Sequence, residues 1–499
     1  MALYYGWRMF ALIPWYDELY TYYCFISKGP LYAAVHWPLP NNHVGYSVLS
    51  ACLDYLGSPY LGLRGISYLC VLANLYLLYK IAGRYLREQT ALVTVILYAS
   101  MNLVNQQAVQ GRGYTLGITC FLLAWHCMAQ ICETTKKTSK RLYACYIGAL
   151  VLGLYTISSN VYWVIPLCLA GGCYLLFNTD KEHRTKLVRL IAASLGAALG
   201  TVFLYTTIWV AIGSNLLVKD PDSIYYGMGH VRMILRAPFA AIGTGIDYML
   251  STPYIQSEER AGFAGRLLEY LKILSGSYFP SLEGAVILVW LAGILFLGFR
   301  LHKGLPASKR LLYLVLLIEI LFVPICLFIQ CKRPYYRVFT YGGILLSLLL
   351  GMLFEAVQNA LFAGTCDEKK RRGVCTAGVL LAVLFGVKCL GFSGYNEQYG
   401  TREYEIADIW ARAGVEELEN FCVTDCNQEY LLYFLYGIRC ENREIEGTDV
   451  LILDKRMMEP CDEMIWEFYH YYETIPWDYV NQNMTRVYEN NDYVLFLRS

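Results

Sequence analysis

The sequence is poor in charged residues. Of its 499 residues, 57% are hydrophobic and 16% are Asp, Glu, Lys or Arg, whereas soluble globular domains carry about 25% charged residues. The formal net charge is +1, so the overall field of the protein gives no reason to expect a nucleic-acid partner. The apolar residues gather in long runs, each close to the ~20 residues that a membrane-spanning helix needs. The composition therefore excludes an ordinary soluble domain and predicts a polytopic membrane protein.

Several familiar motifs are also missing. The 18 cysteines form no Cys-x-x-Cys pair and no Cys/His set with metal-ligand spacing. Most of them lie inside apolar runs, where cysteine acts as a small hydrophobic residue. Cys422, Cys426, Cys440 and Cys461 lie outside these runs, and the sequence leaves open whether they form disulfides or stay reduced. The first residues do not have the layout of a signal peptide, and there is no internal repeat.

Hydropathy predicts about eleven apolar membrane segments. Their ranges are 1–14, 64–82, 90–105, 113–133, 142–158, 160–177, 190–212, 282–300, 311–330, 338–357 and 374–392. The first is too short to cross a bilayer, so it is either a half-length helix or the end of a segment that begins upstream.

Basic clusters predict the orientation. They lie at Arg84/Arg87, 136–141, 181–189, 300–310 and 369–372. With the segments above, all five clusters fall on one face, which the positive-inside rule makes cytoplasmic. We therefore predict a multi-pass protein of the cell membrane with a cytoplasmic N-terminus and an extracytoplasmic C-terminus.

The outer face then receives the large loops. Segment 44–57 is apolar and predicts a helix lying in the membrane interface. Loop 213–281 is too long for a simple connection, and its amphipathic stretch 231–250 is expected to pack over the same face.

The C-terminal tail has a mixed composition, and its pattern predicts strands alternating with helices. It predicts strands at 420–425, 449–454 and 493–497 and a helix at 428–436. We therefore predict an all-α membrane domain over residues 1–392 and a small extracytoplasmic α/β domain over 393–499.

An acidic pair, Asp17-Glu18, follows the first apolar segment. Carboxylates are costly to place at a bilayer surface, so they usually have a function. One of the two is predicted to be a general base beside an acceptor hydroxyl, while the other orients it or binds a cation. The alternative is a solvated helix start, because acidic residues favour the first turn.

A second polar group, Asn41-Asn42-His43, precedes the predicted interfacial helix. These residues are good helix caps. In a functional site, His43 would contact a sugar hydroxyl or ligate a divalent cation. No complete ligand set is visible, so the sequence leaves the metal open.

Cations on the predicted outer face form the third feature. Arg112 lies in Gly111-Arg112-Gly113-Tyr114, which is no dinucleotide fingerprint because no βαβ unit surrounds it. An arginine at this interface suits a lipid phosphate or simply extends to the aqueous surface. Lys332, Arg333 and Arg337 oppose the positive-inside bias, which favours a polyanionic partner or an anionic lipid headgroup.

The order of these motifs resembles the GT-C glycosyltransferases, in particular the protein-mannosyltransferase and aminoarabinose-transferase group (glycosyltransferase family 39). The motifs are Asp17-Glu18, Asn41-Asn42-His43, Gly111 to Tyr114, Gly153-Leu154-Tyr155-Thr156 and Arg333 to Arg337. The resemblance covers residues 10–160 and, less closely, 325–350. It implies an integral membrane enzyme that moves a sugar from a polyprenyl-phosphate donor to a glycan, lipid or protein acceptor on the outer face, with inversion at the anomeric carbon.

The resemblance also implies roles for individual residues. Asp17 matches the catalytic acidic position and Glu18 its neighbour. Arg112, Lys332, Arg333 and Arg337 match positions that hold the donor phosphate, and Asn42, His43 and Tyr114 are further candidates for contacts with the substrate. The chain has Asn-Asn-His-Val where many relatives have His-Pro-Pro, which leaves the role of His43 open.

Two other functions fit a membrane protein of this composition. A transporter or flippase for a lipid-linked glycan should show paired repeats and polar residues at mid-membrane, whereas here the polar residues gather at one face. An O-antigen-type ligase or polymerase would use the large loop, where His230, Arg232 and Arg236 lie. The clustering at one face favours the glycosyltransferase.

Overall fold

The computed structural model describes residues 1–36, 42–134, 138–177, 181–213, 231–232, 235–239, 242–243, 257–362, 368–391, 402–414, 420–461 and 463–499. The protein is mostly helical, with a small C-terminal sheet. Within these residues, eight helices are long and apolar enough to cross a membrane. They are α5 (Pro59–Tyr85), α8 (Tyr114–Glu133), α10 (Val161–Leu176), α11 (Lys181–Gly213), α14 (Glu283–Lys303), α15 (Ala307–Gln330), α16 (Gly342–Leu361) and α17 (Glu368–Leu390).

Three of the predicted membrane segments are shorter than expected. Helix α1 (Ala2–Ala11) has 10 residues, or about 15 Å. The predicted span 90–105 is two helices, α6 (Glu88–Ala99) and α7 (Asn102–Ala108), because the helix ends at Ser100 and restarts after Met101. Helix α9 (Lys140–Thr156), with 17 residues, lies at the lower limit of about 17 for a spanning helix.

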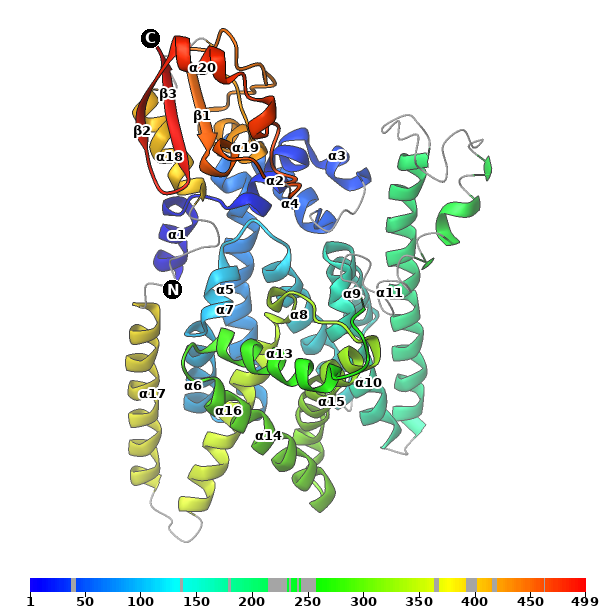
Figure 1. The fold of residues 1–499 in the computed structure, drawn as a ribbon. Coiled ribbons are helices and arrows are strands. Elements are labelled where there is room, and N and C mark those ends of the chain that lie inside the picture. The colour runs from blue at the N-terminus through cyan, green and yellow to red at the C-terminus, as the bar shows by residue number, and fades with distance from the viewer. Residues whose placement is uncertain are drawn as a thin grey trace.

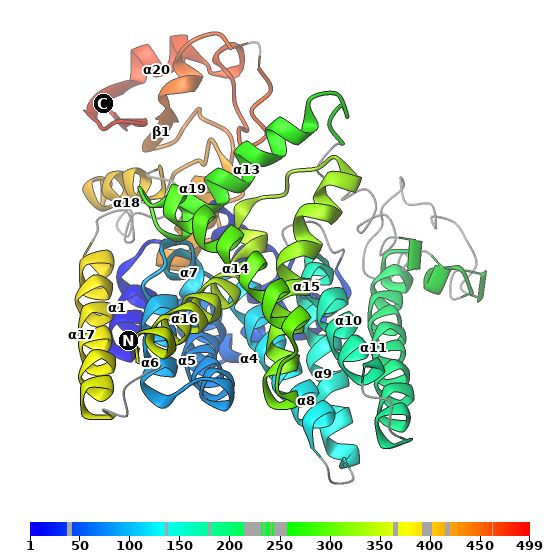
Figure 2. The same ribbon diagram turned by 90° about the horizontal axis from the view of Figure 1, so that it is seen from below.

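The spanning helices differ in how much of their surface they bury. In its apolar window, α8 is 78% buried inside the protein, whereas α11, α14 and α17 are each 17% buried. Large side chains of α8 and α10, including Trp125 and Trp163, fill the centre of the bundle. Both ribbon views place α11 and α17 at opposite edges (Figures 1 and 2). The edge helices thus turn apolar surface outward, as expected in a membrane.

Shorter helices cover one end of the bundle. Helices α2 (Tyr16–Cys24), α3 (Pro30–Val35) and α4 (Val44–Asp54) lie between the bundle and the C-terminal sheet (Figure 1). The predicted interfacial segment 44–57 is thus a helix, α4.

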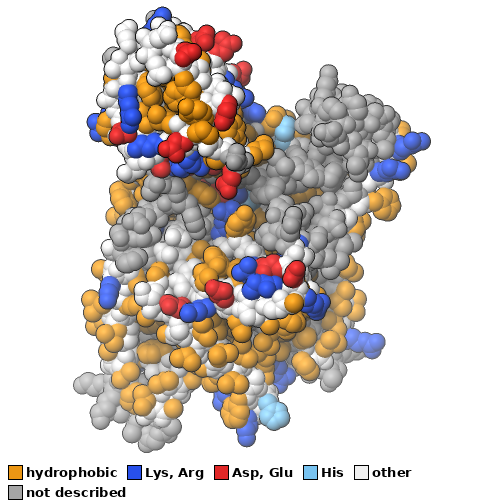
Figure 3. Space-filling model, viewed as in Figure 1, with side chains coloured by type: hydrophobic (Ala, Val, Ile, Leu, Met, Phe, Trp, Pro, Cys, Tyr) orange, Lys and Arg blue, Asp and Glu red, His pale blue; other side chains and the backbone are white. Residues whose placement is uncertain are grey.

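Loop 213–281 contains α13 (Phe263–Tyr278), which the sequence did not predict. The predicted stretch 231–250 lies largely outside the described residues. Charged side chains form a band where α13 runs, with mostly hydrophobic side chains below it (Figure 3).

Among its described residues, the C-terminal region contains three α-helices and a three-stranded sheet. Its elements are α18 (Arg402–Ala413), α19 (Cys426–Tyr436), β1 (Val450–Asp454), α20 (Trp477–Asn483), β2 (Met484–Glu489) and β3 (Tyr493–Arg498). The sheet is antiparallel in the order β1-β3-β2, with Val450 opposite Leu497. The predicted helix and the strands 449–454 and 493–497 are confirmed. The predicted strand 420–425 is wrong, because it contributes only isolated bridges such as Phe421 to Val450. The four cysteines of this region are free thiols.

The C-terminal region packs directly on α2. One apolar cluster joins Leu19 and Tyr22 of α2 to Trp410 of α18 and Leu431 of α19. At the first turn of α2, the backbone N–H of Tyr16 donates to Glu403 Oε1 at 2.7 Å. Helix α2 is therefore held between the membrane bundle and the C-terminal region.

Candidate functional site

The first turn of α2 carries both predicted acidic residues. The helix begins after Trp15, whose backbone N–H donates to Glu18 Oε2 at 3.4 Å, so Glu18 caps its own helix. Successive residues of an α-helix point about 100° apart. Asp17 and Glu18 therefore face different surroundings although they are adjacent.

Glu18 is fully buried in an ionic network. Arg64 of α5 binds it with Nε 2.8 Å from Oε1 and Nη2 2.9 Å from Oε2. The backbone N–H of Gly111 also donates to Oε1, at 2.5 Å. Arg64 in turn donates to the carbonyls of Met9 and Leu12 at 3.1 and 2.5 Å. Glu18 thus joins the end of α1, the start of α5 and the loop before α8, which is the arrangement of a positioning residue.

Asp17 faces the predicted arginines. Its Oδ2 lies 3.1 Å from Nη2 of Arg337 and 3.9 Å from Nη2 of Arg112. The Asp17 and Arg337 side chains are 17% and 18% exposed, while Arg112 is 3% exposed. Asp17 therefore lies beside Arg112 and Arg337, two of the four cations that the resemblance assigns to the donor phosphate. One carboxylate thus lies beside two guanidiniums in a partly dry site, which leaves one positive charge in excess.

Both arginines are held in defined orientations. Nη1 of Arg112 donates to the Asp17 carbonyl at 3.2 Å and to Thr21 Oγ1 at 2.9 Å. Nε of Arg337 donates to the Tyr114 hydroxyl at 3.0 Å. The Arg337 guanidinium also lies 5.4 Å from the centre of the Trp15 ring, within range of a cation–π contact. The planar donor groups are thus fixed before any substrate binds.

His43 completes this cluster. Its Nδ1 accepts the backbone N–H of Gly113 at 2.8 Å, so in the neutral ring Nε2 carries the hydrogen. Nε2 lies 3.3 Å from Nη2 of Arg112. Burial, together with the charges of Arg112 and Arg337, lowers the pKa of His43 well below its usual value. The ring is therefore neutral, and its Nε2 faces the Arg112 guanidinium.

Close backbone approach makes the His43 contact possible. A Cβ on Gly113 would lie 3.1 Å from the Cβ of His43 and 2.5 Å from Cγ2 of Thr156. The glycine therefore lets the start of α8 reach the imidazole and the end of α9. Thr156 belongs to the Gly153–Thr156 motif, and its position beside Gly113 brings two of the quoted motifs together.

The remaining predicted residues make other contacts or are known only by their burial. The side-chain amide of Asn42 donates to the carbonyls of Ala33 and His36 at 3.3 and 3.5 Å, so it fixes the end of α3. Arg333 pairs with Glu258 at 2.5 Å and is not brought to Asp17. Lys332 is buried, and this burial lowers its pKa.

Sequence reasoning missed Arg64, Trp15 and Thr21. An arginine at the start of an apolar segment was the available signal for Arg64, because charges in spanning helices usually have a partner. Trp15 and Thr21 gave no comparable signal. His43 was also a candidate cation ligand, but its Nδ1 already accepts the Gly113 N–H. Among the described residues, no group of three or more His, Cys, Asp or Glu side chains is placed to hold a metal ion.

Comparison with known families gives one match. Residues 45–209 match the family model described as dolichyl-phosphate-mannose-protein mannosyltransferase. The matched region contains Arg112, Tyr114 and Thr156, whereas Asp17 and Arg337 lie outside it. The match supports a GT-C-like glycosyltransferase. No curated protein matches the chain.

Proposed function

We propose that this GT-C-like membrane glycosyltransferase transfers a sugar from a polyprenyl-phosphate donor to an acceptor hydroxyl at the end of the bundle where Asp17 lies. The observation that carries the proposal is the position of Asp17 between Arg337 and Arg112, at 3.1 and 3.9 Å. These residues come from three distant parts of the chain, so only the fold brings them together.

In the proposed reaction, Asp17 acts as the general base. The acceptor oxygen attacks C1 of the sugar while its proton passes to the Asp17 carboxylate. A new C1–O bond forms as the bond from C1 to the phosphate oxygen breaks, and the anomeric carbon is inverted. Polyprenyl phosphate leaves with the bonding electrons. A positioned base of this kind typically contributes about 10²–10⁴-fold in rate.

The arginines would stabilise the leaving phosphate. Preorganised positive charge is usually the largest single contribution to catalysis, because it costs no reorganisation during the reaction. Arg112 and Arg337 are already held by Thr21 and Tyr114. Without a donor, Asp17 compensates one of their two charges, and the donor phosphate would supply a second anion. The positive end of the α8 dipole lies beside them, since α8 begins at Tyr114.

The neutral His43 has a distinct proposed role. Its Nε2–H and Nη2 of Arg112 are both donors and lie 3.3 Å apart. One acceptor oxygen lying beside the two nitrogens could receive a hydrogen bond from each of them. We assign that place to an oxygen of the donor, either on the phosphate or on the sugar.

The setting of the site fits a lipid-linked donor. Helix α2, which carries Asp17, lies between the spanning helices and the C-terminal region (Figure 1). We propose that this is the outer face and that residues 393–499 form an extracytoplasmic domain packed on α2. A lipid donor would then enter from the membrane and the acceptor from outside.

The test is Asp17→Asn in the purified full-length protein, with a polyprenyl-phosphate sugar as donor and release of polyprenyl phosphate as the readout. We expect transfer to fall at least about 100-fold while donor binding changes little, because the volume is almost unchanged. A variant that keeps more than about a tenth of the wild-type rate would remove Asp17 as the base.

A further inference from the structure

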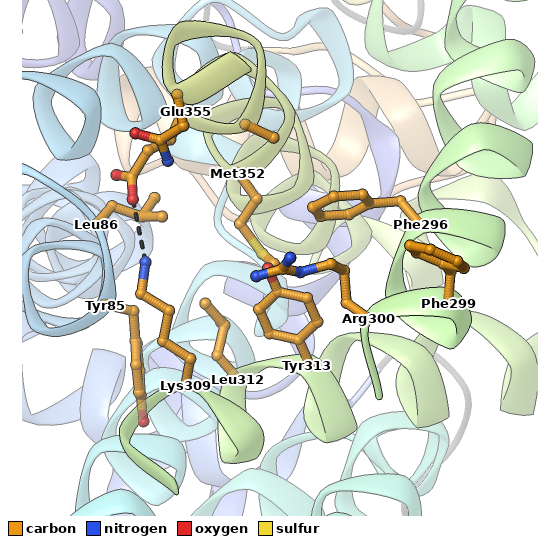
Figure 4. A pocket seen from close by; sticks show the side chains of 12 residues that line it. Tyr85, Leu86, Phe296, Phe299, Arg300, Lys309, Leu312, Tyr313, Met352 and Glu355 are labelled. Carbon is orange, nitrogen blue, oxygen red and sulfur yellow. Dashed lines mark hydrogen bonds and ion pairs between the residues drawn. The ribbon is translucent and has the colours of Figure 1, made fainter. Parts of the chain in front are cut away.

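A second polar cavity lies at the other end of the bundle. Its volume is about 360 Å³, and it is formed where α5, α14, α15 and α16 come together. Polar lining residues are Tyr85, Arg300, Lys309, Tyr313, Glu355 and Asn359. Figure 4 shows the Arg300 guanidinium between Tyr313 and the two phenylalanines of α14. No residue of the Asp17 site lines this cavity.

Helix α16 runs from the neighbourhood of Arg337 to the cavity. It begins at Gly342, shortly after Arg337, and its last turns carry Met352, Glu355 and Asn359 into the cavity. A helix of 20 residues is about 30 Å long, close to the thickness of a bilayer core. Met352 and Asn359 lie about 15 and 26 Å along this helix from Gly342, so the cavity is well removed from Arg337 and lies next to the ends that carry the basic clusters.

Positive charge exceeds negative charge around the cavity. Lys309 pairs with Glu355 at 3.1 Å. The same carboxylate accepts the backbone N–H of Arg87 at 2.9 Å, and the Arg87 side chain reaches Asn359 Oδ1 at 3.4 Å. Arg300 forms no ion pair within the described part of the chain. Three cations therefore lie around a single carboxylate; among the described residues, the Lys309 side chain pairs with it, and the Arg87 and Arg300 side chains do not.

The cavity also has an apolar side that faces outward. Phe296 and Phe299 of α14 line it, and Phe299 is 58% exposed. Leu295 on the same helix is also largely exposed. Because α14 buries little of its surface in the protein, this side would contact lipid chains.

We propose that this cavity binds the phosphate-bearing headgroup of an anionic membrane lipid, with Arg300 and Lys309 on the phosphate and the lipid chains along Phe296 and Phe299. The planar fork of Arg300 suits paired phosphate oxygens, and the tyrosine hydroxyls supply further hydrogen-bonding groups. A soluble phosphate has the same headgroup chemistry but would not contact the apolar side formed by Phe296 and Phe299.

The experiment uses the full-length protein in nanodiscs of phosphatidylcholine with or without phosphatidylglycerol. Native mass spectrometry counts the retained phosphatidylglycerol, and thermal unfolding measures its stabilising effect. Arg300→Gln should weaken phosphatidylglycerol binding about tenfold or more, since a charged hydrogen bond is typically worth that much. Arg300→Lys should weaken it less. Arg184→Gln is the matched control, because Arg184 is an exposed arginine at the start of α11 and does not line the cavity.

The outcomes separate the alternatives. Equal lipid retention by the Arg300→Gln and Arg184→Gln proteins would overturn the site. Equal stabilisation by glycerol phosphate and by phosphatidylglycerol would overturn the lipid assignment and leave a soluble-anion site. Arg300→Lys keeps the test decisive should the Gln variant fail to fold. The result is independent of the Asp17→Asn experiment, since the two sites share no residue.

Discussion

At the scale of single residues, the geometry of the arginines matters more than their charge. Arg337 uses two different nitrogens, with Nε on Tyr114 and Nη2 on Asp17. A lysine has one ammonium group and cannot reach both positions with the same planar spacing. The site is therefore expected to distinguish arginine from lysine.

The corresponding prediction is that Arg337→Lys lowers kcat/KM for the polyprenyl-phosphate donor about tenfold or more. Arg333→Lys is the control, because Arg333 pairs with Glu258 and is more exposed. It should change the rate little. Equal losses in the two variants would indicate that only positive charge at this loop matters, as expected for an arginine that merely extends to the membrane surface.

His43 gives a prediction for pH. Its pKa is lowered by burial and by the two arginines, so the folded state favours the neutral ring. The neutral form stabilises the protein fully above the usual histidine pKa of about 6.5, and this contribution is lost as the pH falls toward the lowered value. Thermal unfolding between pH 7.5 and pH 5 should show this loss.

His43→Asn is the matched variant, since its side-chain oxygen can still accept the Gly113 N–H. It should show a smaller loss of stability over the same pH range. Parallel curves for wild type and variant would assign the pH dependence to other groups.

At the scale of elements, Glu18 and Arg64 determine how α2 sits on the bundle. The pair is fully buried and ties α2 to α5, the end of α1 and Gly111. Removing one partner of a buried pair leaves the other charge uncompensated, which typically costs about 3–5 kcal/mol. Asp17 depends on this attachment for its position.

We therefore predict that Glu18→Gln strongly lowers the thermal unfolding midpoint, whereas Asp17→Asn lowers it less, because the Asp17 and Arg337 side chains are partly exposed. Asp408→Asn is the control for losing a carboxylate from an ion pair, because the Asp408–Arg412 pair is exposed and such surface pairs contribute little to stability. A Glu18→Gln protein that is as stable as wild type but inactive would show that Glu18 acts in the chemistry itself.

At the scale of the whole molecule, the basic clusters and the Asp17 site occupy opposite ends. The α14–α15 connection, the C-terminal end of α16 and the N-terminal end of α17 lie at the bottom of Figure 1, while the C-terminal region lies at the top. This arrangement agrees with the grouping of basic clusters on a single face. The positive-inside rule then predicts that the Asp17 end is extracytoplasmic.

Cysteine labelling with a membrane-impermeant reagent tests this orientation in intact cells. In a background without reactive cysteines, Thr485→Cys in β2 should label, and Ser308→Cys at the start of α15 should label only after lysis. Both positions are exposed in the structure. The reverse pattern would invert the orientation and place the proposed donor site on the cytoplasmic side.

The amino-acid sequence alone predicts a polytopic membrane protein and indicates candidate residues for its active site. Long apolar runs predict spanning helices, since a segment in lipid must satisfy its own backbone. The pattern identified α4, most of the spanning helices and two of the three strands. It failed at 90–105, where hydropathy does not register the turn at Ser100–Met101, and at β2, whose side chains are mostly exposed. The pattern also indicated Asp17, Arg112 and Arg337 as candidate site residues, because charged residues are uncommon beside apolar segments.

Which of these charged side chains contact one another depends on the tertiary structure. Asp17 and Glu18 are neighbours in sequence, yet helix geometry turns Asp17 toward Arg112 and Arg337 and buries Glu18 against Arg64. Arg333 and Arg337 are four residues apart, yet Arg333 turns to Glu258. Composition and spacing fix the kinds of groups available, but partners separated by hundreds of residues are chosen by how the helices pack. The cavity around Arg300 likewise has no sequence signature, because its walls come from four helices that meet only in the folded protein.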